Sequence, residues 1–167
     1  MTSVKLLEYV VPPPQLILPT ERNNIMTRQA MERAFSDLPE QSSGGLIDAK
    51  SFLMGIADDI SEDIVGIMCA TPNVKGNSAL VVTPNRIIEM TSGGAMQVLA
   101  YSELSSVQAV GGAKKRFGRA YETIFLRVGS PQGGMRTYPL FGDHEWNSRI
   151  SADAEAAFNR YRLKSSI

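Results

Sequence analysis

Cysteine and histidine are almost absent from the sequence, and their scarcity removes several classes of function. The only cysteine, Cys69, cannot form an intramolecular disulfide, and no histidine or cysteine cluster has the spacing of a zinc site. A reducing, cytoplasmic setting is therefore the default expectation. His144 is the only histidine, and no nucleophile motif lies beside it. We expect His144 to be an exposed residue at a helix start and Cys69 to be a small buried apolar residue.

An excess of charge and a long apolar run are also missing. The 17 Lys and Arg residues balance 17 Asp and Glu residues, so the formal net charge is zero. No overall field then steers the protein toward nucleic acid or a membrane, and charge-driven binding must come from local patches. No apolar run reaches the roughly 18 residues of a transmembrane helix. The first residues lack the cationic start of a signal peptide.

Motifs for catalysis, cofactors and metals are not found either. The glycine pairs do not have the spacing of a nucleotide-binding loop, and no nucleophile stands beside a base. The sequence therefore predicts a non-enzymatic protein without a cofactor, with a small hydrolase as the enzyme alternative. An acidic group before the first strand lacks the spacing of a calcium loop, so we expect solvated linker charges or, alternatively, a contact with a basic loop of a neighbouring subunit. Its members are Asp58, Asp59, Glu62 and Asp63.

Three zones follow one another along the chain. Residues 1–19 form an apolar arm in which three consecutive prolines, Pro12 to Pro14, enforce an extended path. Residues 20–60 have the apolar periodicity of helices. From residue 61 the apolar and polar residues follow the period of strands, and this last zone extends to residue 167. The arm is too apolar for a solvated tail and needs a surface on its own or a neighbouring subunit. The residues that would make this contact are Leu6, Leu7, Tyr9, Val10, Leu16, Ile17 and Leu18.

The middle zone predicts two short helices. Thr20 is a suitable N-cap for a helix that runs to about residue 37, and Asp48 is suitable for a second helix that runs to about residue 60. Between them, Pro39 and a glycine pair at 44–45 have the chemistry of a loop. The two helices would form either a helical subdomain or a packing layer for the strands that follow.

The last zone predicts seven short antiparallel strands and one C-terminal helix. The strands are expected at 63–71, 78–83, 86–90, 95–101, 105–110, 123–128 and 135–141. Their close succession indicates a meander that closes into a barrel or into two orthogonal sheets. A helix over 144–163, capped by Asp143, carries one continuous apolar stripe. The stripe consists of Trp146, Ile150, Ala154, Ala157, Phe158 and Tyr161.

The order of these elements and one turn resemble the bacterial pleckstrin-homology (PH)-like domains over about residues 60–164. Thr83 and Arg86 match the two ends of a T-x-x-R turn between strands. Tyr101, Leu104 and Val107 match the later strand pattern of these domains. The resemblance implies an α+β fold, in which a C-terminal helix caps a seven-stranded antiparallel bent barrel. It does not imply one ligand, because PH-like domains bind phosphoinositides, peptides or proteins.

The most basic stretch follows the fifth predicted strand and is expected to be a loop. Its cations are suited to phosphates of a lipid headgroup or a nucleic acid, and its Phe to insertion in a bilayer surface. As an alternative, a solvated hairpin tip would protect a sheet edge from aggregation. In lipid-binding PH domains the cations lie mainly between the first two strands, where only Lys75 occurs here. The candidate anion-binding residues are Lys114, Lys115, Arg116, Phe117 and Arg119.

Two functions follow as hypotheses. The first is an interaction module that recognises a protein or peptide, with an anionic membrane surface as a further candidate ligand; the zero net charge disfavours nucleic acid. The second is an assembly subunit, as in particles or capsids, whose arm crosses to a neighbour and pairs with a sheet edge or fills a groove.

Overall fold

The computed structural model describes residues 19–39, 47–73, 76–91 and 94–166. Residues 1–18 of the predicted arm lie outside these ranges, and so does the one cation of the first strand connection. The residues concerned are Leu6, Leu7, Tyr9, Val10, Leu16, Ile17, Leu18 and Lys75. Pro19, predicted as the last arm residue, is the first residue of a helix.

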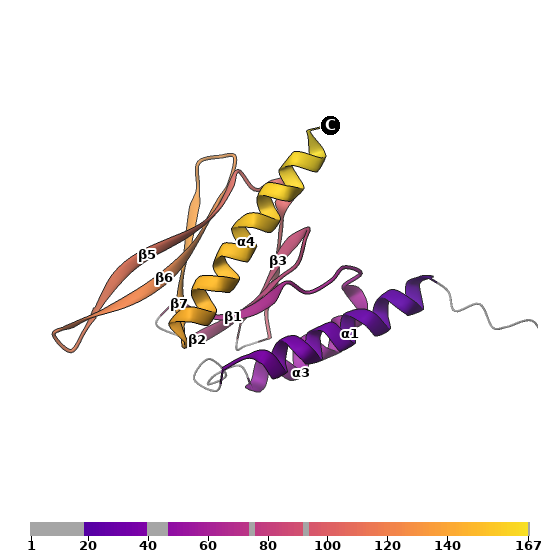
Figure 1. The fold of residues 1–167 in the computed structure, drawn as a ribbon, viewed down its shortest axis with the longest axis horizontal. Helices are drawn as coiled ribbons and strands as arrows, with labels where there is room; N and C mark the ends of the chain where they lie inside the picture. The colour runs from indigo at the N-terminus through magenta and orange to yellow at the C-terminus, as the bar shows by residue number, and fades with distance from the viewer. Residues whose placement is uncertain (1–18, 40–46, 74–75, 92–93, 167) are drawn as a thin grey trace, which may run out of the picture.

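The fold is α+β, as predicted, with seven antiparallel strands and a C-terminal helix (Figure 1). The helices are α1 (Pro19–Asp37), α3 (Ile47–Gly55) and α4 (His144–Ser165), and two short 3-10 turns are η1 (Ala57–Asp59) and η2 (Tyr101–Glu103). The strands are β1 (Gly66–Asn73), β2 (Gly76–Val82), β3 (Arg86–Thr91), β4 (Met96–Ala100), β5 (Ser106–Arg116), β6 (Arg119–Gly129) and β7 (Met135–Phe141). None of these helices is long and apolar enough to cross a lipid bilayer.

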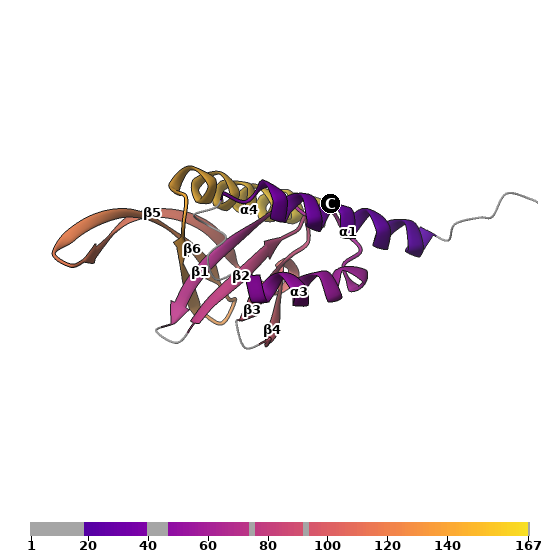
Figure 2. The ribbon, with the colours of Figure 1, turned by 90° about the horizontal axis from the view of Figure 1, so that it is seen from below.

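The sheet order is β4-β3-β2-β1-β7-β6-β5, so neighbours along the chain are neighbours in the sheet except where β7 joins β1. That junction is short, since only Cys69↔Phe141 and Ala70↔Leu140 are paired. The sheet therefore has two sections, β1–β4 and β5–β7, which turn away from one another at the junction (Figure 2). Among the described residues, the end strands β4 and β5 do not pair with each other, which leaves an opening between the two sections.

Helix α4 lies across the inner faces of both sections and fills the space between them. Its N-cap is Asp143, as predicted, whose carboxylate accepts a hydrogen bond of 2.7 Å from the Trp146 amide. The predicted apolar stripe is confirmed, because all six residues pack into the core that the two sections share. The largest buried side chain of the stripe, Phe158, meets the Tyr101 ring edge-on at a centroid distance of 5.6 Å.

Helices α1 and α3 cover the outer face of the β1–β4 section (Figures 1 and 2). Met31 of α1 and Leu53 of α3 are fully buried in a second core, together with the outward-facing residues of β1, β2 and β3. The helical extension is thus a packing layer on this sheet, while the domain division at residue 61 stays a prediction. Cys69 lies in this second core, and its burial raises the pKa of the thiol to about 11, so the thiol stays neutral as expected of a structural cysteine.

Candidate functional site

The basic stretch is not a loop, which corrects the prediction. Strands β5 and β6 pair without interruption from Ser106↔Gly129 to Arg116↔Arg119, so Lys114, Lys115 and Arg116 are strand residues. The turn consists only of Phe117 and Gly118, with φ angles of 52° and 74°. Two consecutive positive φ values are typical of the tight type I′ hairpin turn.

The outer half of this hairpin is a two-stranded ribbon. Strand β7 accompanies β6 only as far as Phe125↔Pro139, and beyond that point the ribbon projects from the body at the left of Figure 1. Lys115 and Arg119 are exposed, and Phe117 is 93% exposed. A bulky residue at positive φ costs about 1 kcal/mol or more, where asparagine or glycine would fit with less strain.

Two residues of the acidic group before β1, Asp58 and Glu62, form contacts that stabilise the fold. Glu62 accepts hydrogen bonds from Thr83 Oγ1 at 3.0 Å and from Arg86 Nε at 2.6 Å. The predicted solvated state is wrong for Glu62, whose side chain is only 11% exposed, because the partners lie on the distant β2–β3 turn. Asp58 forms an ion pair of 2.8 Å with Arg28 of α1. These contacts fasten the chain that connects the helical layer to the sheet.

The T-x-x-R turn is held from two sides. The Tyr101 hydroxyl donates a 2.8 Å hydrogen bond to the Thr83 carbonyl, and the Tyr101 amide donates to the Asn85 carbonyl at 3.0 Å. Burial raises the pKa of Glu62, but the hydrogen bonds from Arg86 and Thr83 and the charge of Arg86 outweigh that effect, so the net pKa is lowered. The turn residues are therefore architectural, and Glu62 stays ionised near neutral pH.

No group of three or more His, Cys, Asp and Glu side chains among the described residues is placed to hold a metal ion. His144 is exposed at the first position of α4, as predicted.

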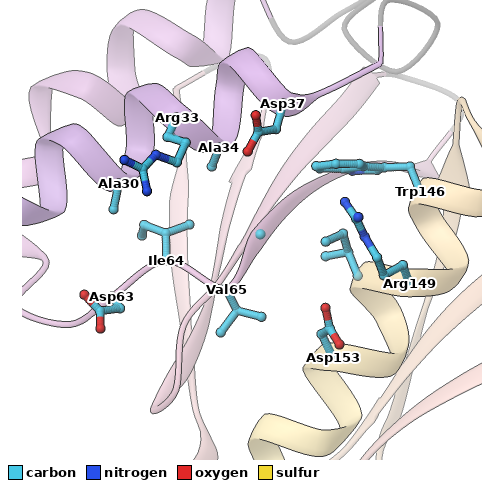
Figure 3. Close-up of a pocket in the computed structure, with 12 residues that line it drawn as sticks. Ala30, Arg33, Ala34, Asp37, Asp63, Ile64, Val65, Trp146, Arg149 and Asp153 are labelled. Carbon is cyan, nitrogen blue, oxygen red and sulfur yellow. The ribbon is translucent and has the colours of Figure 1, made fainter.

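A cleft of about 520 Å³ lies between α1 and α4 (Figure 3). Arg33 and Asp37 enter it from α1, while Arg149 and Asp153 enter it from α4. The Arg149 guanidinium lies 4.7 Å from the centroid of the Trp146 ring. Asp63 also lines the cleft, so three carboxylates and two cations surround it, and the mixed charge does not select a strongly charged ligand of either sign.

The outer edge of β4 is open for hydrogen bonding. The bonds Thr91 N–H to Ala95 C=O (2.9 Å) and Tyr101 N–H to Asn85 C=O (3.0 Å) identify the residues that face β3. Since hydrogen-bonded and non-bonded pairs alternate in an antiparallel ladder, the amides and carbonyls of Met96, Val98 and Ala100 point away from β3. No described strand pairs with this edge.

Apolar side chains flank this edge on the outer face of the sheet. Phe52 of α3 is 52% exposed, Met96 is 49% exposed and Val98 is 39% exposed. Phe52 lies against the β3–β4 connection, since a Cβ atom at Gly94 would come within 3.3 Å of its ring. We call Phe52, Met96 and Val98 the outer apolar patch.

A cavity of about 310 Å³ flanks the same edge on the inner side, in the opening between the two sheet sections. Its wall is mainly apolar and carries one cation, Arg136. The side chains that line it include Gln97, Leu99, Leu104, Val128, Met135 and Arg136.

The Arg136 guanidinium is held by a partly buried hydrogen-bond network. Its Nη1 donates to Glu89 Oε2 at 3.1 Å, to the Tyr138 hydroxyl at 3.2 Å and to Gln97 Oε1. The Tyr138 hydroxyl donates to Glu89 Oε2 at 2.7 Å, and burial raises the pKa of Tyr138, so the phenol stays protonated. No hydrogen bond from Nε or Nη2 to a described residue accompanies these, and the Arg136 side chain is 49% exposed. Arg136 thus offers oriented donors to a ligand.

The β4 edge and this network were not predicted from the sequence. One local signal was present, since Glu89 is a charged residue inside the apolar strand β3 and is only 7% exposed. A buried carboxylate requires partners, and Arg136 and Tyr138 supply them from the other section of the sheet. Comparisons of the chain with known protein families, with curated proteins and with solved structures find no match.

Proposed function

We propose that the protein is a non-enzymatic interaction module with a PH-like barrel, and that it binds an extended segment of a protein or peptide along the free edge of β4. The PH-like assignment is supported by the meander of seven strands followed by α4. It is also supported by Thr83, Arg86 and Tyr101, the residues of the resemblance, which meet at one turn.

The β4 edge carries the proposal. A strand that adds to it would satisfy the outward amides and carbonyls of Met96, Val98 and Ala100, and main-chain hydrogen bonds of this kind supply affinity in strand addition. Alternate side chains of the ligand would then reach the outer apolar patch on one face and the cavity beside Arg136 on the other. The ligand is therefore an extended segment that is apolar on both faces and carries one carboxylate.

The opposite end of the sheet is already covered near the body. Glu155 of α4 accepts a 3.0 Å hydrogen bond from the Ala109 amide on strand β5. Farther out, Lys115 and Arg119 place charge on the ribbon, which discourages pairing with another strand. Among the described residues, no such protection lies at β4, whose flanking residues are mainly apolar.

The Val98→Pro variant tests the proposal, because proline removes an outward amide and leaves the bonds between β4 and β3 intact. Peptides selected from a random displayed library on the full chain are expected to alternate apolar residues around one acidic residue. Their affinity, measured by fluorescence anisotropy, is expected to fall about tenfold or more in Val98→Pro, a change of about 1.4 kcal/mol.

Val98→Thr is the matched control, since threonine keeps the amide and the β-branched shape. Its affinity is expected to stay within about threefold of the parent, and circular dichroism verifies that both variants are folded. Peptides that bind Val98→Pro as tightly as the parent protein, or a selection that yields none, would contradict binding at β4.

The ribbon favours a second candidate function, contact with an anionic membrane. It presents Lys115, Arg119 and Phe117 at the end of a projecting hairpin (Figure 1). A cation near an anionic bilayer contributes about 1 kcal/mol, and a large apolar side chain adds to this by insertion.

Reversal of two ribbon charges tests this candidate. Sedimentation of the Lys115→Glu/Arg119→Glu variant with phosphatidylserine-containing vesicles is expected to fall about 10-fold or more at low salt. The Arg160→Glu/Lys164→Glu variant on exposed positions of α4 changes the net charge equally and controls for it. Phe117→Asn keeps a favourable turn residue and isolates the contribution of the ring. Equal sedimentation of both double variants would remove the membrane candidate.

A further inference from the structure

We infer that the segment bound at the β4 edge is residues 4–11 of a second copy of this chain, so that the protein self-associates through its N-terminal arm. The inference rests on the proposed function and names the partner of that site. The alternation, the charge and the length of the arm sequence support this partner, and so does the direction of α1.

The arm segment is apolar on both faces if it is extended. Residues 4–11 read VKLLEYVV, so Val4, Leu6, Glu8 and Val10 alternate with Lys5, Leu7, Tyr9 and Val11. An ordinary edge strand has one polar face, because one face meets water. A strand bound at β4 meets the outer apolar patch on one face and the cavity on the other, and this segment satisfies both.

Charge fixes which face enters the cavity. Glu8 is the only acidic residue among the first 20, and it shares its face with Leu6 and Val10. The cavity carries Arg136 among apolar side chains, and this guanidinium, which already forms an ion pair with Glu89, keeps donors for a second carboxylate. A carboxylate at Glu8 would receive the Nε and Nη2 donors of Arg136, in the orientation that Glu89, Tyr138 and Gln97 impose on the guanidinium.

The length and the end of the segment fit the strand. Proline has no amide to donate, so the three prolines from Pro12 end a strand at Val11. Strand β4 has five residues, and Leu6 to Val10 cover the same length. With Glu8 opposite Gln97, Leu7 and Tyr9 fall opposite Met96 and Val98 in either strand direction.

The direction of α1 favours a second copy over the same chain. The N-terminal end of α1, drawn in indigo, extends past the sheet in both Figure 1 and Figure 2. The arm joins α1 at that end, and Pro12 to Pro14 act as a stiff extended spacer. Reciprocal exchange of two arms would close a two-fold dimer.

Disulfide trapping tests the contact and the partner together. Full-length Val98→Cys protein is mixed under mild oxidation with Leu7→Cys protein in one sample and with Tyr9→Cys protein in another. One of the two mixtures is expected to give a disulfide-linked heterodimer on a non-reducing gel, and the identity of that mixture reports the strand direction. Cys69 is buried and does not compete. Absence of a heterodimer in both mixtures would overturn the inference.

Two further readouts separate the sources of failure. A double variant combines Val98→Cys with whichever arm cysteine, at Leu7 or at Tyr9, formed the heterodimer, and it is expected to form interchain dimers. An intrachain disulfide would show that the arm binds its own chain and would overturn the role of a second copy. In sedimentation velocity, the full chain is expected to dimerise, and Glu8→Lys is expected to raise the dimer dissociation constant about 10-fold or more. Glu32→Lys, on an exposed position of α1, controls for the charge change.

A monomeric full chain would also overturn the inference. If selected peptides still depend on the Val98 amide in that case, the proposed function stands and only the identity of its partner fails. If neither peptide binding nor self-association through the arm depends on the β4 edge, the proposed function fails together with the inference.

Discussion

Replacement of Phe158 by alanine is expected to lower the free energy of unfolding by about 3–5 kcal/mol. The ring is 2% exposed and belongs to the core that joins α4 to both sections of the sheet. It lies edge-on to Tyr101 with an interplanar angle of 86°, an arrangement that contributes beyond simple burial. Since only two residue pairs join β1 to β7, the packing of α4 against both sections is a further link between them. A cavity at Phe158 should therefore weaken both sections together.

Urea denaturation followed by circular dichroism measures this effect, and Leu163→Ala on the same helix is the matched control. Leu163 is 70% exposed, so its removal is expected to change stability by no more than about 0.5 kcal/mol. Similar losses in the two variants would show that α4 stabilises the protein mainly through its own helix propensity and not through the shared core.

Local patterns in the sequence were sufficient to predict α4 and β7. The apolar residues of α4 recur at helical spacing and Asp143 caps its first turn, and both signals lie within the helix itself. Strand β7 occupies 135–141 as expected, because glycine-rich and polar turns delimit it on both sides. The order of seven strands before one helix was predictable for the same reason.

Charge misled the prediction of the β5–β6 hairpin. Lys114, Lys115 and Arg116 were interpreted as a loop, because consecutive cations usually mark solvent-exposed connections. The strands continue through them, since pairing with β6 satisfies the backbone whatever the side chains are. The turn at Phe117 has a positive φ that no propensity assigns to phenylalanine.

Contacts between distant segments were beyond the sequence. Glu62 pairs with a residue 24 positions away, and Glu89 pairs with one 47 positions away. The β4 edge is a site because of the sheet order, which leaves β4 at one end and places Arg136 of β7 across the opening. Alternation along β4 alone gives no information on whether its outer edge is covered.

Replacement of Arg86 by leucine is expected to lower the free energy of unfolding by about 1.5–3 kcal/mol, because it removes charge-assisted hydrogen bonds and leaves the carboxylate of Glu62 without its cation in a partly buried site. The Arg86 side chain is 25% exposed and that of Glu62 is 11% exposed. The Arg86 Nη2 also donates to the Asp59 carbonyl at 3.3 Å, so the variant would release the chain before β1 at two points. The double variant Glu62→Gln/Arg86→Leu removes the stranded charge and is expected to recover part of the loss.

The pH dependence of stability identifies the ion pair as the cause. The folded pKa of Glu62 lies below its ordinary value of 4.5, so the contribution of the pair is fully present above about pH 4.5 and is lost as the pH falls through the lowered pKa. The stability difference between the parent protein and Glu62→Gln should therefore be largest near neutral pH and should shrink in acid. Arg28→Leu removes the exposed pair with Asp58, and its effect is expected to stay within about 1 kcal/mol. A difference for Glu62→Gln that is constant from neutral pH into acid would mean that packing, and not charge, holds the turn to the chain before β1.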